Sequence, residues 1–294
     1  MRIHTPISMG ISLCLVGSIA YADGNTTTVE QTGNNHQVTA NQVDPTATNN
    51  LIEVIQADEA QVSNSLQDTS TNLSIIRHEQ VTLGNEADST QTNFSDDAEV
   101  NIYQEGAGNF ASTLQDSTSS SLVDISQFDN ANDIIFSQTD SSFDTVNLNQ
   151  SGFDNQMLVT QTTTTFNSLN VSQTGDQNSA DAEQTGFDNL LTSSQTGNLN
   201  TYFSIQTGDI LVATSTQIGD GNISTQTQTG DILLVSTLQD GIGNMSIVDQ
   251  TGAMQTASST QIGTTNLHTI TQSVDNQTAI GTQNGVLNQG FIMQ

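Results

Sequence analysis

Residues 104–115 read QEGAGNFASTLQ, and this pattern organises the chain. Its two glutamines lie 11 residues apart, and a glycine and an asparagine follow the first glutamine by two and five residues. The interval of 11 occurs twelve times, in repeats that begin 22 to 25 residues apart. A register kept this strictly argues against a disordered chain. The pairs take up 24 of the 32 glutamines: Gln31 and Gln42, Gln56 and Gln67, Gln80 and Gln91, Gln104 and Gln115, Gln127 and Gln138, Gln150 and Gln161, Gln173 and Gln184, Gln195 and Gln206, Gln217 and Gln228, Gln239 and Gln250, Gln261 and Gln272, and Gln283 and Gln294.

Each repeat contains a turn between two strands. Glycine follows the first glutamine by two residues in nine repeats, and asparagine follows it by five in ten. Both residues tolerate positive φ, which is typical of turns. Before Gln104, the apolar Val100 and Ile102 alternate with polar residues, and alternation with period two predicts a strand. The predicted turn formers include Gly106, Asn109, Gly152, Asn155, Gly175, Asn178, Gly197, Asn200, Gly219, Asn222, Gly241, Asn244, Gly263, Asn266, Gly285 and Asn288.

We name the strand before the first glutamine of a pair the first arm, and the strand before the second glutamine the second arm. The inner turn joins the two arms of one repeat. The outer turn leads to the next repeat and absorbs the variation in length, as around Pro45. Stacking such repeats predicts an all-β fold, a parallel two-sheet, β-helix-like β-solenoid of twelve strand-turn-strand repeats. Equivalent glutamines would then lie about 4.7–4.8 Å apart in side-chain ladders.

At every defined position, residues 104–115 match the curlin repeat, Q-x-G-x-x-N-x-A-x-x-x-Q. The chain from about residue 25 to 294 therefore resembles a curlin-type protein, the subunit of curli, which are functional amyloid fibres of bacterial surfaces. The resemblance implies a secreted, extracellular subunit that polymerises for adhesion and biofilm matrix. It implies copies of the chain itself, a curli-type nucleator and a secretion pore as partners. The chain departs from the pattern where Asp58, Thr82 and Asp129 replace the turn glycine, and a Gly-rich secretion segment is missing before the first repeat.

The composition restricts the remaining function classes. Two Lys and Arg residues stand against 31 Asp and Glu, a net charge of -29, so nucleic acid and anionic membrane surfaces are excluded as partners. Residues 1–22 read as a signal peptide cleaved after Ala22, which leaves a repeat region over residues 23–294. The only cysteine, Cys14, lies in that peptide, so the mature chain has no disulfide. No later stretch is long and apolar enough for membrane insertion.

Several residues invite sharper interpretations. Turn aspartates could bind calcium, but solvated turn residues at dispersed offsets are the simpler interpretation: Asp154, Asp176, Asp188, Asp209, Asp220 and Asp231. His36, His78 and His268 occupy different offsets and form no metal cluster. Catalytic residues, metals and cofactors are not expected, because near-identical repeats offer few unique positions for an active site.

Two alternatives to the fibre subunit stay open, a monomeric solenoid that binds ice and one that acts as an adhesin. The threonines after the glutamines suggest ice binding, although Ser151, Ile218, Asp240 and Ile262 interrupt the series. We expect fibre growth instead, because the twelfth repeat ends at Gln294 without a capping segment, and an open strand edge favours stacking.

Overall fold

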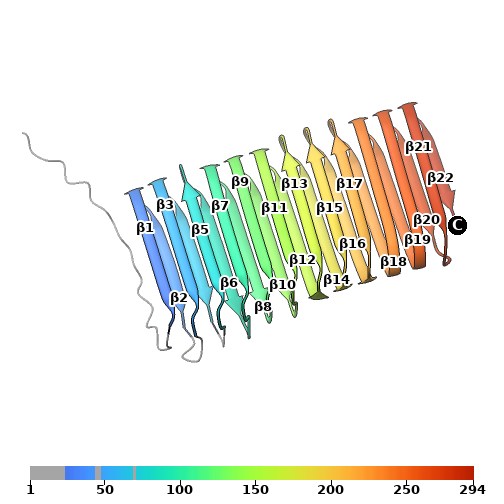
Figure 1. Cartoon of the computed structure of the whole chain (residues 1–294). Helices are drawn as coiled ribbons and strands as arrows, with labels where there is room; N and C mark the ends of the chain where they lie inside the picture. The colour runs from blue at the N-terminus through green and yellow to red at the C-terminus, as the bar shows by residue number, and fades with distance from the viewer. Residues whose placement is uncertain (1–23, 44–47, 69–70) are drawn as a thin grey trace, which may run out of the picture.

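The computed structural model describes residues 24–43, 48–68 and 71–294, and over these ranges the chain is a stack of parallel strands in two layers (Figure 1). The described residues contain no helix, and therefore none that would reach across a bilayer. The fold class is confirmed as an all-β parallel solenoid. The expected signal peptide, with Cys14, lies outside the described residues.

The first arms form one sheet and the second arms form the other. Two outer turns are themselves extended, so β18 (Ile223–Ile242) and β19 (Met245–Thr264) each contain a second arm followed by the next first arm. The remaining first arms are β1 (Thr26–Asn34), β3 (Leu51–Glu59), β5 (Ile75–Val81), β7 (Glu99–Ala107), β9 (Leu122–Asn130), β11 (Thr145–Phe153), β13 (Ser168–Thr174), β15 (Leu190–Thr196), β17 (Val212–Ile218) and β21 (Thr278–Val286). The remaining second arms are β2 (Gln37–Gln42), β4 (Val62–Gln67), β6 (Glu86–Thr92), β8 (Phe110–Asp116), β10 (Asp133–Thr139), β12 (Gln156–Thr165), β14 (Ser179–Phe187), β16 (Thr201–Asp209), β20 (Leu267–Gln272) and β22 (Gln289–Met293).

Every arm pairs in parallel with the equivalent arm of the next repeat, without a slip at the glutamines. In the first-arm sheet, for example, Gln104 pairs with Gln127 and Gln127 with Gln150. The second-arm sheet keeps the same register, as where Gln206 pairs with Gln228. Each repeat thus contributes one rung to each sheet, and equivalent side chains form columns along the stack.

The core is a narrow seam between the two sheets. Inward residues alternate with outward ones along each arm, so Val100, Ile102 and Gln104 of β7 are all buried. Large side chains of one sheet meet small ones of the other: the ring of His78 lies between the hydroxyls of Ser63 and Ser89. Because the seam is narrow, few apolar residues fill it in each rung. This explains how a chain with 33% hydrophobic content folds.

The outer turns of the later repeats copy the inner turns, which sequence reasoning did not anticipate. Gly186, Gly208, Gly230 and Gly252 follow the second glutamines by two residues and have φ from 115° to 133°, like the glycines of the inner turns. The signal was available, because residues 184–189 read QTGFDN and the inner turn at 150–155 reads QSGFDN. The 22-residue repeats are therefore two similar halves of 11 residues.

The turn glycines are required by the neighbouring rung as well as by their dihedral angles. A Cβ on Gly219 (φ 101°) would lie 2.1 Å from the carbonyl oxygen of Gly241 in the next rung. Gly221, two residues later, has φ 65° and open space where its Cβ would be. At the three repeats without the turn glycine, Asp58, Thr82 and Asp129 keep positive φ angles of 80°, 77° and 69°. The turn thus survives in these repeats at a strained position.

This difference predicts the outcome of two matched substitutions. Gly219→Asn should lower the free energy of unfolding by about 2–3 kcal/mol, because the new Cβ overlaps the next rung and φ is unfavourable. Gly221→Asn should change it by less than about 0.5 kcal/mol, because asparagine tolerates the left-handed region. Urea unfolding of the freshly purified soluble chain measures both. Equal losses in the two variants would contradict this account of the turn.

Candidate functional site

The register glutamines form two continuous hydrogen-bonded columns through the seam. In the first-arm column each Nε2 donates to Oε1 of the next rung at 2.8–3.0 Å, from Gln31 to Gln283. The second-arm column does the same at 2.8–3.3 Å, from Gln42 to Gln294. All donors point toward the C-terminal end, so the amide dipoles of both columns are aligned.

The columns also join the two sheets. The Nε2 of Gln217 donates to the carbonyl oxygen of Thr201 at 2.9 Å, from the first-arm sheet across to β16. The reverse connection runs from Gln228 to the carbonyl oxygen of Val212 at 3.1 Å. A carboxamide has two N–H groups, and here one serves the ladder and the other the opposite sheet. Each such glutamine therefore fixes both the register and the spacing of the sheets.

The inner-turn asparagines form a third column with the opposite polarity. The Nδ2 of Asn200 donates back to Oδ1 of Asn178 at 3.1 Å, and the backbone N–H of Asn200 donates to the same oxygen at 3.0 Å. Its Nδ2 also donates forward, to the carbonyl oxygen of Gly219 at 2.7 Å. The predicted turn pair of glycine and asparagine is thus one hydrogen-bonded unit across rungs. The remaining predicted turn formers occupy the same positions: Gly106, Asn109, Gly152, Asn155, Gly175, Gly197, Asn222, Gly241, Asn244, Gly263, Asn266, Gly285 and Asn288.

Comparison with known families agrees with this geometry. The curlin associated repeat matches residues 96–128 and 167–201. These segments contain the inner turns with Asn109 and Asn178 and the register glutamines beside them. The chain carries curlin associated repeats in these two segments, which supports a curlin-type repeat protein. The curlin repeat family is structural and non-enzymatic. Among curated proteins, no sequence matches the chain.

The first two repeats of the chain lack the asparagine. His36 and Gln61 are buried at the asparagine position, and their side chains form the hydrogen bonds between rungs that asparagine forms elsewhere. The backbone N–H of Gln61 donates to Nδ1 of His36 at 3.4 Å, and Nε2 of Gln61 donates to the carbonyl oxygen of Thr82 at 2.6 Å. The position therefore needs a side chain that bridges rungs, and asparagine is one way of meeting the need.

The outer turns carry a fourth, mixed column that sequence reasoning missed. The backbone N–H of Asn189 donates to Oδ1 of Asn167 at 2.8 Å, and that of Leu211 donates to Oδ1 of Asn189 at 2.8 Å. In one rung the column residue is Asp144, which is 1% exposed and accepts from the backbone N–H of Asn167 at 2.7 Å. Burial raises the pKa of Asp144 above its ordinary value, although its hydrogen bonds act in the opposite direction.

Three of the six turn aspartates, Asp176, Asp209 and Asp220, cap backbone amides of the preceding rung, a role that the sequence did not reveal. Asp176 accepts from the N–H of Phe153 at 3.0 Å, and Asp220 accepts from that of Asn198 at 2.9 Å. Their predicted dispersal is wrong for Asp209 and Asp231, which are direct partners in adjacent rungs. No group of three or more His, Cys, Asp or Glu in the described ranges is placed to hold a metal ion.

The threonines after the glutamines belong to two different columns. All four interruptions, including Ser151 and Ile218, fall in the first-arm column. The second-arm column is an uninterrupted series of six: Thr139, Thr162, Thr185, Thr207, Thr229 and Thr251. The interruptions therefore do not argue against an ordered threonine array on the second-arm sheet.

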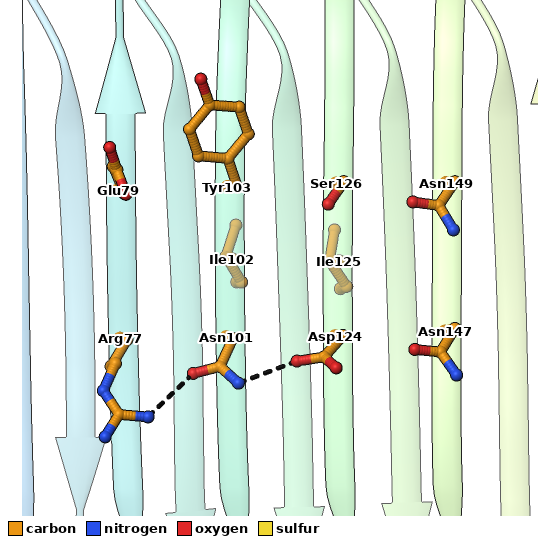
Figure 2. A pocket seen from close by; sticks show the side chains of 10 residues that line it. All are labelled: Arg77, Glu79, Asn101, Ile102, Tyr103, Asp124, Ile125, Ser126, Asn147 and Asn149. Carbon is orange, nitrogen blue, oxygen red and sulfur yellow. Dashed lines mark hydrogen bonds between the residues drawn. The ribbon is translucent and has the colours of Figure 1, made fainter.

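Arg77 lies on the outer face of the first-arm sheet. It lines a shallow hollow of ≈ 420 Å³ together with outward residues of the following rungs, such as Asn101, Asp124 and Asn147 (Figure 2). Its Nε lies 3.4 Å from the Glu53 carboxylate in the preceding rung, and it also pairs with Glu99 in the following one. Figure 2 shows its bond to Asn101, 3.2 Å long, and that of Asn101 to Asp124, 2.8 Å long. These pairs are more than a third exposed, so each contributes about 0–1 kcal/mol. Arg77 is accommodated by the stack rather than disturbing it.

We predict a large difference between register and surface glutamines. Gln217→Ala leaves the amides of Gln195 and Gln239 without their partner, and should lower the free energy of unfolding by about 3 kcal/mol. The matched change Gln156→Ala removes an exposed glutamine and should cost less than about 0.5 kcal/mol. Chemical unfolding of both variants tests this, and similar losses would show that the ladder does not stabilise the fold.

His78 makes stability depend on pH with a defined sign. Its ring is 1% exposed, and desolvation lowers its pKa from 6.5 to about 3. As the pH falls below about 6.5, His78 becomes protonated in the unfolded chain but stays neutral in the folded chain. The free energy of unfolding therefore decreases as the pH drops from about 6.5 toward 3. His78→Val, which matches Val54 in the preceding rung, should abolish up to about 2–3 kcal/mol of the loss between pH 7 and pH 4.5. An unchanged difference between these two pH values would contradict the assignment.

Proposed function

We propose that the chain is the structural subunit of an extracellular, curli-like amyloid fibre that grows by end-to-end stacking of solenoids. The proposal places it outside a bacterial cell, at the surface, in adhesion and biofilm matrix. Its partners would be copies of itself and a curli-type nucleator or secretion pore. The family match and the solenoid fold support a curli-like structural protein, and the finer role rests on the chemistry of the columns.

One observation carries the proposal: the ladders repeat the same donors and acceptors in every rung. Gln195 relates to Gln217 as Gln217 relates to Gln239, with Nε2 to Oε1 distances of 2.9 and 3.0 Å. A rung from a second molecule in the same orientation would meet the same hydrogen-bonding groups at the same spacing. Stacking between molecules would then use the interactions that already hold the rungs of one molecule together.

Fibre diffraction and electron microscopy of the purified mature chain, residues 23–294, test the proposal. We expect unbranched fibres with a reflection at about 4.7–4.8 Å along the fibre axis, which is the spacing of parallel rungs. The variant Gln217→Ala, compared with Gln156→Ala, should slow growth selectively. Soluble monomers without this reflection after days of incubation would refute the fibre and leave a monomeric solenoid.

Lowering the pH from 7 to 4 should shorten the lag before fibres appear. Burial raises the pKa of Asp133, Asp144 and Asp181, so protonation near their folded-state pKa relieves a cost that the folded chain bears when they are ionised. The buried His78 acts in the opposite direction, so the shortening should be larger in His78→Val. Lag times in a dye-binding assay that do not change with pH in either protein would refute this.

A second candidate function, ice binding by the soluble chain, is favoured by the uninterrupted threonine column from Thr139 to Thr251. Threonine is also a favoured surface residue of strands, so the column has a purely structural explanation. A thermal hysteresis measurement distinguishes ice binding from a purely structural role of the threonines. The double variant Thr207→Lys with Thr229→Lys disrupts the threonine column. Hysteresis in the unmodified chain that this variant abolishes would establish the second function.

A further inference from the structure

The outer turns between residues 143 and 254 lie along one long edge of the stack, opposite the inner turns (Figure 1). They carry a row of exposed apolar side chains. We name this row the outer-turn ridge. Each member is between 45% and 52% exposed: Phe143, Phe166, Phe187, Ile210, Ile232 and Met254. The aromatic part is continuous, because the ring centroids of Phe143 and Phe166 lie 5.1 Å apart and those of Phe166 and Phe187 lie 5.6 Å apart.

The backbone disfavours most of these residues. Phe143, Phe166, Ile210, Ile232 and Met254 all have φ between 57° and 59°, the left-handed region, where bulky and above all β-branched residues are outliers. Because their side chains are half exposed, burial does not compensate for the strain. Strained, solvent-exposed apolar residues in a row are characteristic of interaction surfaces.

The inner turns provide an internal comparison. They place a residue in the same left-handed conformation in each repeat, but there it is mostly small or polar, as with Asn35, Asp154, Gly221 and Gly243. Large apolar residues occupy it at Leu199 and Leu287 alone among the twelve inner turns, all of which are described. The same backbone requirement is thus met mostly by small or polar residues at the inner turns, and by Phe, Ile or Met at five of the six outer-turn positions from Phe143 to Met254. The fold does not demand the ridge.

Acidic residues border the ridge. Asp188 takes the left-handed position in the rung between Phe166 and Ile210, and Asp209 and Asp231 directly precede Ile210 and Ile232. All three carboxylates belong to exposed residues. Arg77, the one Lys or Arg of the described ranges, is paired with Glu53 and Glu99 on the first-arm sheet far from these rungs. The ridge is therefore an apolar stripe within a negative field.

We propose that the outer-turn ridge binds a cationic amphipathic helix of another protein, with apolar residues on the ridge and Lys or Arg against its aspartates. A second copy of this chain fits less well, because it would bring its own Asp209 and Asp231 to the contact and has no free cation in the described ranges to offer. The six rungs span about 24 Å, the length of a helix of about 16 residues. Apolar residues spaced three and four apart on a helix rise about 4.5–6 Å, close to the rung spacing.

This surface lies on the side of the solenoid and is parallel to the stacking direction. It is accessible in a single molecule and in a stack alike, so the proposal does not rest on fibre growth. In a fibre, each stacked molecule would add its own outer-turn ridge, and stacking would leave these ridges uncovered.

A binding experiment with the full mature chain tests the proposal. The probe is a fluorescent 16-residue helical peptide of Leu and Lys, with Leu at every third or fourth position. One control peptide has each Leu replaced by Ser and keeps the charge, and a second has each Lys replaced by Glu and keeps the apolar face. We expect the Leu–Lys peptide to bind at least tenfold more tightly than either control, with an affinity that falls as salt is raised.

Variants locate the site. The triple variant Ile210→Asn, Ile232→Asn and Met254→Asn should bind the peptide at least tenfold more weakly, whereas its unfolding midpoint should not fall, because asparagine suits the left-handed region. Asp209→Asn with Asp231→Asn should weaken binding and reduce its salt dependence. The matched variant Leu199→Asn, on the opposite edge, should bind as the unmodified chain does.

Three results would overturn the proposal. The first is equal binding of the Ser–Lys peptide, which would reduce the interaction to charge. The second is unchanged binding in the triple variant. The third is a lateral dimer of the chain in light scattering that the triple variant abolishes, which would make a second copy the occupant of the ridge.

Discussion

The hydrogen bond from one register glutamine to the next is the interaction on which the rest of the structure depends. A carboxamide buried between two sheets must find both donors and acceptors, since an unpaired buried polar group costs about 1–3 kcal/mol. At the rung spacing of parallel strands, the same carboxamide in the adjacent rung meets that need. The interval of 11 between Gln217 and Gln228 therefore cannot vary without opening two ladders at once. The aligned Nε2 to Oε1 bonds polarise one another in the same sense, which strengthens a long column more than a short one. The asparagine column runs in the reverse sense beside them.

The ladders also explain how so polar a chain builds a core. Because the glutamines hold the sheets at a fixed separation, few further side chains fill the seam in each rung, as Val146, Leu148, Met157 and Val159 do in one rung. Where one of these side chains is large, small residues such as serine lie opposite it. His78 lies against Ser63 and Ser89, and the hydroxyl of the buried Tyr202 donates to Gln226 at 3.0 Å. The buried titratable groups that result have shifted pKa values of opposite sign, downward for His78 and upward for Asp144. The response of the fold to acid is a balance between them.

Much of this architecture could be predicted from the sequence, because the arms alternate with period two and the glutamines keep one interval. The fold class and the in-register stacking follow from those two patterns alone. The outer turns of the later repeats could have been found from the likeness of residues 184–189 to 150–155, but the longer early repeats conceal it. Other features depend on contacts across the seam or between rungs, which a single repeat does not contain: the burial of Asp144, the pairing of Asp209 with Asp231, and the capping of amides by Asp176. The left-handed φ of Ile210 contradicts local propensity, so no propensity argument would have predicted it.

Hydrogen exchange of the glutamine side chains tests the central claim most directly. The Nε2 groups of interior register glutamines such as Gln104, Gln217 and Gln239 each donate to the next rung. Gln37, Gln156 and Gln177 are exposed and serve as the comparison. In the nitrogen-labelled soluble chain, the side-chain N–H protons of the register glutamines should exchange more slowly than those of the exposed glutamines by several orders of magnitude. Protection should also be lost cooperatively along a column when one member is replaced by alanine. Exchange at the same rate in both groups, in a chain whose backbone amides are protected, would show that the sheets stand without the ladders and would contradict the account.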